Sequence, residues 1–158
     1  MVAKTRPGRA TRVSLLVMFG ALTLGTSPSS EDEIGGAPLR IIIENVSPQG
    51  GDMRVALFSR DTYDGHTGQP LLETVGPATS PETIVTLEKV RPGTYAVKMF
   101  QDVQRKGAFV TTSLGLPAEP YGFSNDAMPI LDQPSFDSAK FQMSEKPLSI
   151  VVHLRHGL

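Results

Sequence analysis

Two carboxylates and an imidazole lie close together in the sequence, at Asp61, Asp64 and His66. Carboxylate oxygen and imidazole nitrogen are ligands that transition metals accept, so the three residues form a candidate metal site. The segment also contains Gly65, and an Asp in such a segment commonly hydrogen-bonds the backbone of a solvated turn. We favour the turn, and the sequence therefore predicts no metal and no other cofactor here.

Ser124 is the candidate nucleophile of a hydrolase. A nucleophile elbow needs a second Gly two residues after the Ser and then a helix, whereas Asn125 is followed by Asp126 at that position and no helical pattern comes after it. Glu119 is a single candidate buried acid, which does not make a mechanism. His153 and His156 are three residues apart on an extended chain and point to opposite faces, so they suit a surface better than a joint site. We therefore predict a protein that is not an enzyme and keep a hydrolase as the least favoured alternative.

The elements that must position these residues are strands. Leu39, Ile41 and Ile43 alternate with residues of a second face, and residues 139–143 and 148–154 show the same period of two. Shorter runs with apolar residues on both faces, typical of central strands, occupy residues 54–59, 83–87 and 94–101. Segments rich in Pro and Gly separate the runs and predict turns. The expected fold is all-β, a single antiparallel β-sandwich of about seven strands.

Residues 59–82 and 102–137 show no clear period and are predicted to be loops, with one-turn helices at most. Loops above about 12 to 15 residues are uncommon in compact domains unless they have a function. The second loop is too apolar to be simply solvated, since it contains Phe109, Leu114, Leu116, Tyr121, Phe123, Met128, Ile130 and Leu131. It either packs over an edge or end of the sandwich, as we favour on general grounds, or presents a binding surface.

The first residues have the composition of an export signal. Four basic residues precede an apolar run at 13–24, and small residues follow it. The run is much shorter than the roughly 20 residues that span a bilayer, so we predict no transmembrane segment in the mature chain. The expected organisation is a signal peptide at 1–29, a flexible leader at 30–38 and the β-domain at 39–158. A periplasmic or secreted location follows.

Charge and cysteine content narrow the function classes. Removal of residues 1–29 takes away four of the 15 basic residues and none of the 16 acidic ones, which leaves a net charge of −5. This balance argues against nucleic acid as a partner. The chain has no cysteine, which excludes disulfides, thiol catalysis and attachment of a lipid in the manner of bacterial lipoproteins.

Three ordered blocks between residues 91 and 141 carry a family resemblance. They are Gly-Thr-Tyr-Ala-Val at 93–97, Leu-Gly-Leu-Pro-Ala-Glu-Pro-Tyr-Gly-Phe-Ser-Asn at 114–125, and Pro-Ser-Phe-Asp-Ser-Ala-Lys-Phe at 134–141. In these blocks the chain resembles a bacterial family of exported β-domains, domain of unknown function 2141. The resemblance implies a transthyretin-like sandwich, similar to the regulatory domains of carboxypeptidases. Such domains support binding, spacing or assembly, although fold alone does not fix function.

The resemblance also implies a calcium loop directly after the strand that begins with Gly-Thr-Tyr-Ala-Val. The family commonly carries alternating Asp and Asn residues and a Gly there, a pattern of oxygen ligands. This chain keeps Asp102 and Gly107 and has Gln104 as a weak substitute, but Lys106 places a cation where a ligand belongs. We interpret the segment as a hairpin turn. A calcium-binding structural module, with Asp102 and Gln104 as weak metal candidates, remains the first alternative.

The leading hypothesis is an exported, non-enzymatic module that binds a protein or another envelope component through residues 109–128. The tentative binding residues are Phe109, Leu116, Glu119, Tyr121, Phe123, Ser124 and Asn125.

Overall fold

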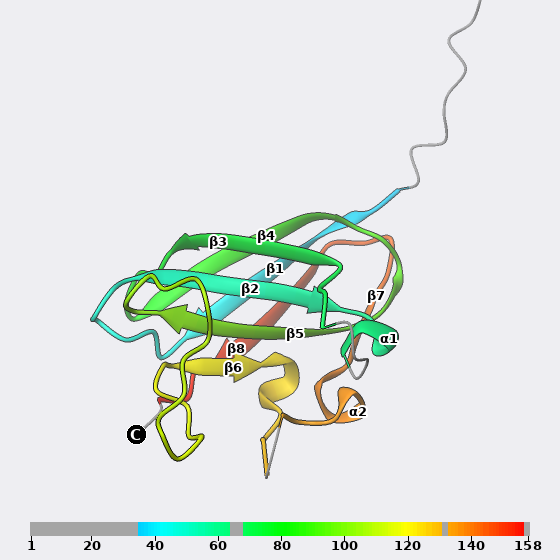
Figure 1. Cartoon of the computed structure of the whole chain (residues 1–158). Coiled ribbons are helices and arrows are strands. Elements are labelled where there is room, and N and C mark those ends of the chain that lie inside the picture. Colours follow the sequence, from blue (N-terminus) through cyan, green and yellow to red (C-terminus); the bar gives the residue numbers. More distant parts are fainter. Residues whose placement is uncertain (1–34, 64–67, 131–132, 157–158) are drawn as a thin grey trace, which may run out of the picture. The chain divides into compact units, whose positions relative to one another are not determined.

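The structure, a computed structural model, describes residues 35–63, 68–130 and 133–156 (Figure 1). The predicted signal peptide and most of the predicted leader lie outside the described residues. The leader is nevertheless shorter than expected, because strand β1 (Ala37–Glu44) begins two residues earlier and buries Ala37. No helix in the described part of the chain is long and apolar enough to cross a membrane.

A three-stranded sheet contains β1 at its centre, with β4 (Glu82–Val90) and β8 (Leu148–His153) beside it. The alternation in β1 has the predicted consequence, since Leu39, Ile41 and Ile43 are fully buried. β4 pairs with β1 antiparallel, but β8 pairs with β1 parallel, which the expected antiparallel arrangement did not include. β4 is an edge strand rather than a central one.

The second sheet is organised by β5, the longest strand. One edge of β5 pairs with β2, which in turn pairs with β3, and two short strands, β6 and β7, pair with different parts of β5. The described chain thus has eight strands rather than about seven, because β3 and β6 lie in the two segments predicted to be loops. The strands of this sheet are β2 (Asp52–Phe58), β3 (Leu72–Pro77), β5 (Gly93–Asp102), β6 (Tyr121–Phe123) and β7 (Phe141–Met143).

Buried apolar residues from both sheets form one large cluster, in which Leu39, Ile41 and Ile43 of β1 join Val55 of β2 and Val97 of β5. This confirms an all-β domain with a shared core. A second, smaller cluster consists of Phe58, Tyr63, Ala96, Ala127, Phe136 and Ala139.

The second cluster is covered by short helices that the sequence allowed as single turns. These are α1 (Arg60–Tyr63), the 3-10 helix η1 (Ser124–Asp126) and α2 (Phe136–Ala139). Ser135 caps α2 by accepting a hydrogen bond from the Ser138 backbone N–H. In Figure 1, α1 and α2 lie near one end of β5, and the yellow-green loop formed by residues 103–120 lies at the other end.

Candidate functional site

A groove of about 650 Å³ lies over the five-stranded sheet. Its floor includes Arg54 and Ala56 of β2, which are in register with Phe100 and Lys98 of β5. The inner-facing neighbours of these residues, such as Val55, are buried in the core. Ala56 has the smallest of these four side chains, so the floor of the groove is deepest at its position, between the longer side chains. The volume is in the range of pockets that hold small molecules or inserted side chains.

Aromatic rings form one wall of the groove. Phe109 packs edge-to-face on Phe100, with ring centroids 5.4 Å apart, and on Tyr121 at 6.0 Å. Tyr121 packs in the same way on Phe123, at 6.0 Å. The loop of residues 103–120 brings Phe109 here, and a bridge between Thr111 and Pro117 closes its tip. The predicted loop is therefore ordered, and part of it packs over the sheet.

The rim of the groove exposes large apolar side chains. Leu114 is 84% exposed and Ile130 is 90% exposed, while Phe109 and Leu116 are exposed by about two-fifths. Ile130, Leu116 and Phe109 line the groove itself. Apolar side chains of this size are not expected to gather on a surface without a function.

The charged groups of the groove are held in place by other groups of the protein. Arg54 donates from Nε to Asp102, at 3.1 Å, and its Nη1 lies 3.9 Å from Glu73. The Lys98 ammonium lies over the ring of Phe58, 4.5 Å from its centroid, and donates to Gln133 at 2.7 Å. These residues fix the shape of the floor as well as its charge.

Asp102 ends β5, and its carboxylate is fully buried. Oδ1 accepts from the Lys106 backbone N–H at 2.8 Å, and Oδ2 accepts from the Gly107 N–H at 2.7 Å and from Arg54. Burial raises the pKa of Asp102, but these three hydrogen bonds outweigh it and hold the pKa below its usual value. The carboxylate thus accepts its hydrogen bonds from backbone amides and a guanidinium. Gln104, the other weak metal candidate, is exposed. This geometry favours the predicted hairpin turn over a calcium loop.

The seven predicted binding residues separate into two groups. Phe109, Leu116, Tyr121 and Phe123 all line the groove. The other three, Glu119, Ser124 and Asn125, are not among the described residues that line it.

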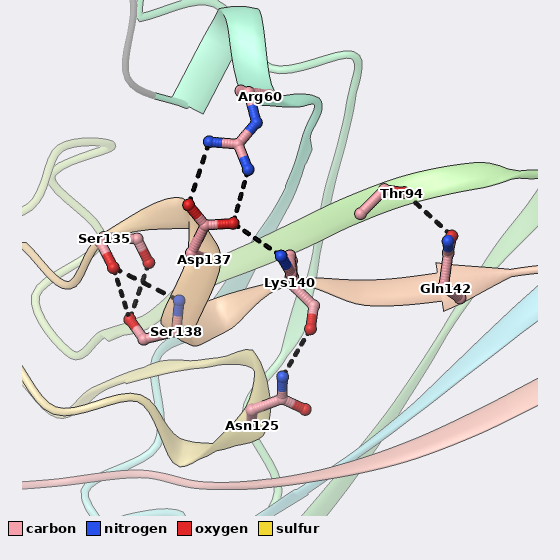
Figure 2. Close-up of polar contacts among 8 residues, drawn as sticks. All are labelled: Arg60, Thr94, Asn125, Ser135, Asp137, Ser138, Lys140 and Gln142. Carbon is pink, nitrogen blue, oxygen red and sulfur yellow. Dashed lines mark hydrogen bonds and ion pairs between the residues drawn. The ribbon is translucent and has the colours of Figure 1, made fainter.

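Ser124 and Asn125 are structural. Ser124 is fully buried; its hydroxyl accepts from the Val97 N–H and donates to the Ala139 carbonyl. Asn125 has a φ of 57° and donates from Nδ2 to the Lys140 carbonyl, as Figure 2 shows. The backbone partners of both side chains lie 15 to 27 residues away in the sequence, on β5 and at the end of α2, so the two residues join distant segments rather than a local turn.

Figure 2 also shows how the α2 segment is held to α1. Arg60 donates to both oxygens of Asp137, at 2.6 and 3.3 Å, and Lys140 donates to one of them at 2.7 Å. The hydrogen bond from Arg60, followed by that from Lys140, lowers the pKa of Asp137 to about 2. The Lys140 carbonyl also accepts from Asn125, which links the end of α2 to η1.

Gly122 lies where two strands approach each other closely. It lies within β6 and does not have a positive φ. A Cβ at this position would lie 3.0 Å from Val152 and 3.3 Å from Leu154. Glycine suits this position because β6 approaches β8 closely, at the place where Tyr121 also bridges to Arg155, and a larger residue would displace the side chains of Val152 and Leu154.

Glu119 is the buried acid that the sequence suggested. It is 4% exposed, and Oε2 accepts from the Val110 N–H at 3.2 Å. Within the described residues, its Oε1 is buried without a hydrogen-bond partner. Its hydrogen bond is to the backbone of the same loop, so Glu119 helps to hold the loop of residues 103–120 in its conformation.

The candidate metal triplet is only partly described. Asp61 is exposed in α1, while Asp64 and His66 lie outside the described residues. Across 35–63, 68–130 and 133–156, no three His, Asp or Glu side chains are grouped in a way that suits a metal ion.

His153 is a surface residue, as predicted, but it lies between two carboxylates. Its Nδ1 is 2.7 Å from Asp126, and its Nε2 is 3.3 Å from Glu44. The hydrogen bond and charge of Asp126, joined by Glu44, raise the pKa of His153 and outweigh its slight desolvation.

Replacing Asp126 with Asn is therefore expected to lower the pKa of His153 toward its ordinary value near 6.5. Because the folded pKa is raised, this pair stabilises the fold fully below pH 6.5, and the stabilisation is lost as pH rises through the folded pKa. An NMR titration of the His153 ring measures the shift. Glu88→Gln, on β4, is the control and should leave the titration unchanged; an unchanged titration in D126N would contradict the assignment.

Sequence reasoning missed most of the groove floor. Arg54, Ala56 and Lys98 were recognised as strand residues, but their shared surface depends on the register between β2 and β5. The available signal was the outward-facing set of β5, in which Lys98 and Phe100 alternate with buried residues.

Comparisons with known proteins support the resemblance found in the motifs. Neither curated proteins nor solved structures gave a match to this chain. Residues 41–151 match the model of a family described as uncharacterized protein conserved in bacteria, DUF2141. This range contains nearly all of both sheets and the whole groove, and the chain belongs to the DUF2141 family.

Proposed function

We propose that this protein is an exported, non-enzymatic β-sandwich module of transthyretin-like type that binds a protein of the cell envelope. The binding surface is the groove with the rim formed by residues 109–128, extended by Ile130. The observation that carries the proposal is the aromatic-lined groove beneath exposed Leu114, Leu116 and Ile130. The signal-like residues 1–29 support a periplasmic or secreted location.

The physical reason for binding is the apolar surface that a partner covers. Burying an apolar side chain of this size contributes about 1.5 to 3 kcal/mol, and aromatic anchors in a pocket commonly dominate an interface. The wall of Phe100, Phe109 and Tyr121 is already packed before a partner arrives. A preformed wall limits the entropy lost on binding.

The geometry supports the two alternatives less well. A hydrolase that used Ser124 would need a hydroxyl open to substrate, whereas this hydroxyl is buried between two backbone groups. A calcium module would need the Asp102 oxygens, which already accept three hydrogen bonds from the protein.

Leu114→Asp and Ile130→Asp test the proposal, because both side chains are almost fully exposed and their loss does not disturb the core. With a photo-crosslinker placed at Leu116 and the protein produced in its native envelope, we expect one dominant crosslinked protein. The combined aspartate variant should reduce its yield at least tenfold, since each charge must be desolvated against an apolar partner. Phe123→Ala is less suitable, because Phe123 packs against the second cluster and its loss also destabilises the fold.

Ile84→Asp is the matched control. Ile84 is an exposed apolar residue of the other sheet, so this variant should keep the full crosslinking yield. Equal losses in both variants, or an unchanged yield in the groove variant with an unchanged melting temperature, would contradict the groove as the binding surface.

A further inference from the structure

A row of apolar side chains crosses the outer face of the three-stranded sheet. Ile42 of β1 is paired in register with Ile84 of β4 on one side and with Val151 of β8 on the other. Ile42 alternates with buried Ile41 and Ile43, so it faces away from the core. Ile84 and Val151 are 47% and 43% exposed, and Ile42 is half-buried between them. We call Ile84, Ile42 and Val151 the apolar row.

Charges of opposite sign flank the apolar row. Two residues before Ile42, Arg40 is in register with the uncharged residues Thr86 and Ser149. Two residues after Ile42, Glu44 is in register with Glu82 and with His153. Within these three rows, Arg40 lies on one side of the apolar row and Glu44 and Glu82 lie on the other. His153 is 3.3 Å from Glu44, and exposed Glu88 lies farther out on β4, on the Arg40 side.

We propose that this face binds a second copy of the chain, with a two-fold axis running along the apolar row. Rotation about this axis places Ile42 of one copy on Ile42 of the other. It exchanges the two flanks, so Arg40 of each copy lies opposite Glu44 of the other. A two-fold interface uses the same patch twice, and here each patch contains both halves of the charge pair.

The charge pattern selects this axis over the other in-plane choice. A two-fold axis parallel to the strands would place Arg40 on Arg40 and Glu44 on Glu44. Like charges in contact oppose association, so that arrangement is disfavoured. With the axis along the row, Thr86 lies opposite Glu82 and Ser149 lies opposite His153, and no like charges meet in these three rows.

The face is small for a protein–protein interface. Three strands at about 4.8 Å spacing and about six residues at 3.3 Å rise cover roughly 300 Å² per copy. Standard interfaces bury about 800 Å² per partner. The dimer is therefore weak and reversible, and it is populated at high micromolar to millimolar concentration or where the protein is concentrated locally.

Sedimentation velocity from micromolar to millimolar concentration tests the proposal with two charge-reversal variants. R40E and E44R each replace two attractive contacts of the dimer with two repulsive ones, and each alone should associate roughly tenfold more weakly than wild type or less. An equimolar mixture of R40E and E44R restores both attractive contacts, and it should associate like wild type. A mixture that stays monomeric, or wild-type protein that is monomeric at millimolar concentration, overturns the proposal.

Two further variants separate this face from the groove. Ile84→Lys places a charge in the exposed apolar row and should abolish association while the fold is kept. Leu114→Asp, on the groove rim, should associate like wild type. If Leu114→Asp abolishes association and Ile84→Lys does not, the copies meet through the groove and the inference is wrong.

Discussion

Replacing Asp102 with Asn is expected to lower the free energy of unfolding by about 3 kcal/mol, which is the lower part of the range for breaking a buried ion pair. The carboxylate is fully buried and accepts from Lys106, Gly107 and Arg54. An amide has only one acceptor oxygen, and its NH₂ group faces donors. The Arg54 side chain, itself only 21% exposed, then loses its main anion. Urea denaturation measures the loss.

The exposed ion pair at the same turn is the control. Arg105 donates to Asp52 at 3.1 Å, and the Arg105 side chain is 65% exposed. Such pairs contribute about 0 to 1 kcal/mol, so Arg105→Ala should change stability little. Equal effects of D102N and R105A would show that the Asp102 network does not carry the expected energy.

The same network predicts the acid response. Because the pKa of Asp102 is lowered in the folded protein, its contribution is present above the ordinary value of 3.8 and is lost as pH falls through the folded pKa. Wild-type protein should therefore lose more stability than D102N on acidification below that value.

Replacing Gln101 with Met is expected to lower the free energy of unfolding by about 3 to 5 kcal/mol, because a fully buried side chain loses three hydrogen bonds at nearly constant volume. Gln101 is fully buried in β5. Its Oε1 accepts from the Ser47 N–H at 2.9 Å, and its Nε2 donates to the carbonyls of Ser47, at 2.9 Å, and Gly50, at 2.7 Å. These bonds hold the turn between β1 and β2, and thus one link between the sheets.

Gln142 provides the matched control for this prediction. It is exposed in β7 and makes one side-chain bond, accepting from Thr94 at 2.9 Å (Figure 2). Gln142→Met should change stability by less than about 0.5 kcal/mol. If Q101M unfolds at the same denaturant concentration as Q142M, the turn is not held by Gln101.

The turn also shows why local sequence reasoning was incomplete. Its Gly residues predicted a chain reversal, and Gly51 indeed has a φ of 94°. What the turn rests against was not visible, because Gly51 packs on the backbone of Asp102, where a Cβ would lie 2.3 Å from the carbonyl oxygen. A glycine required by close approach to a distant strand has no local signature.

The sequence by itself determined the all-β class and the buried faces of β1 and β8, and it singled out four residues that line the groove. Side-chain direction in a strand alternates at every residue, so alternation along β1 reveals its buried face without knowledge of its neighbours. The high apolar content of the second loop is likewise visible without knowledge of its neighbours.

The tertiary structure decided how these elements pair. The parallel pairing of β1 with β8 and the presence of β3 and β6 depend on segments that are distant in sequence. The register of β2 on β5 decided that Ala56 lies beside Lys98, and therefore where the groove lies. Arg54, 48 residues from Asp102, supplies the cation of the turn. Such pairings depend on the packing of the whole core, which local period and composition do not encode.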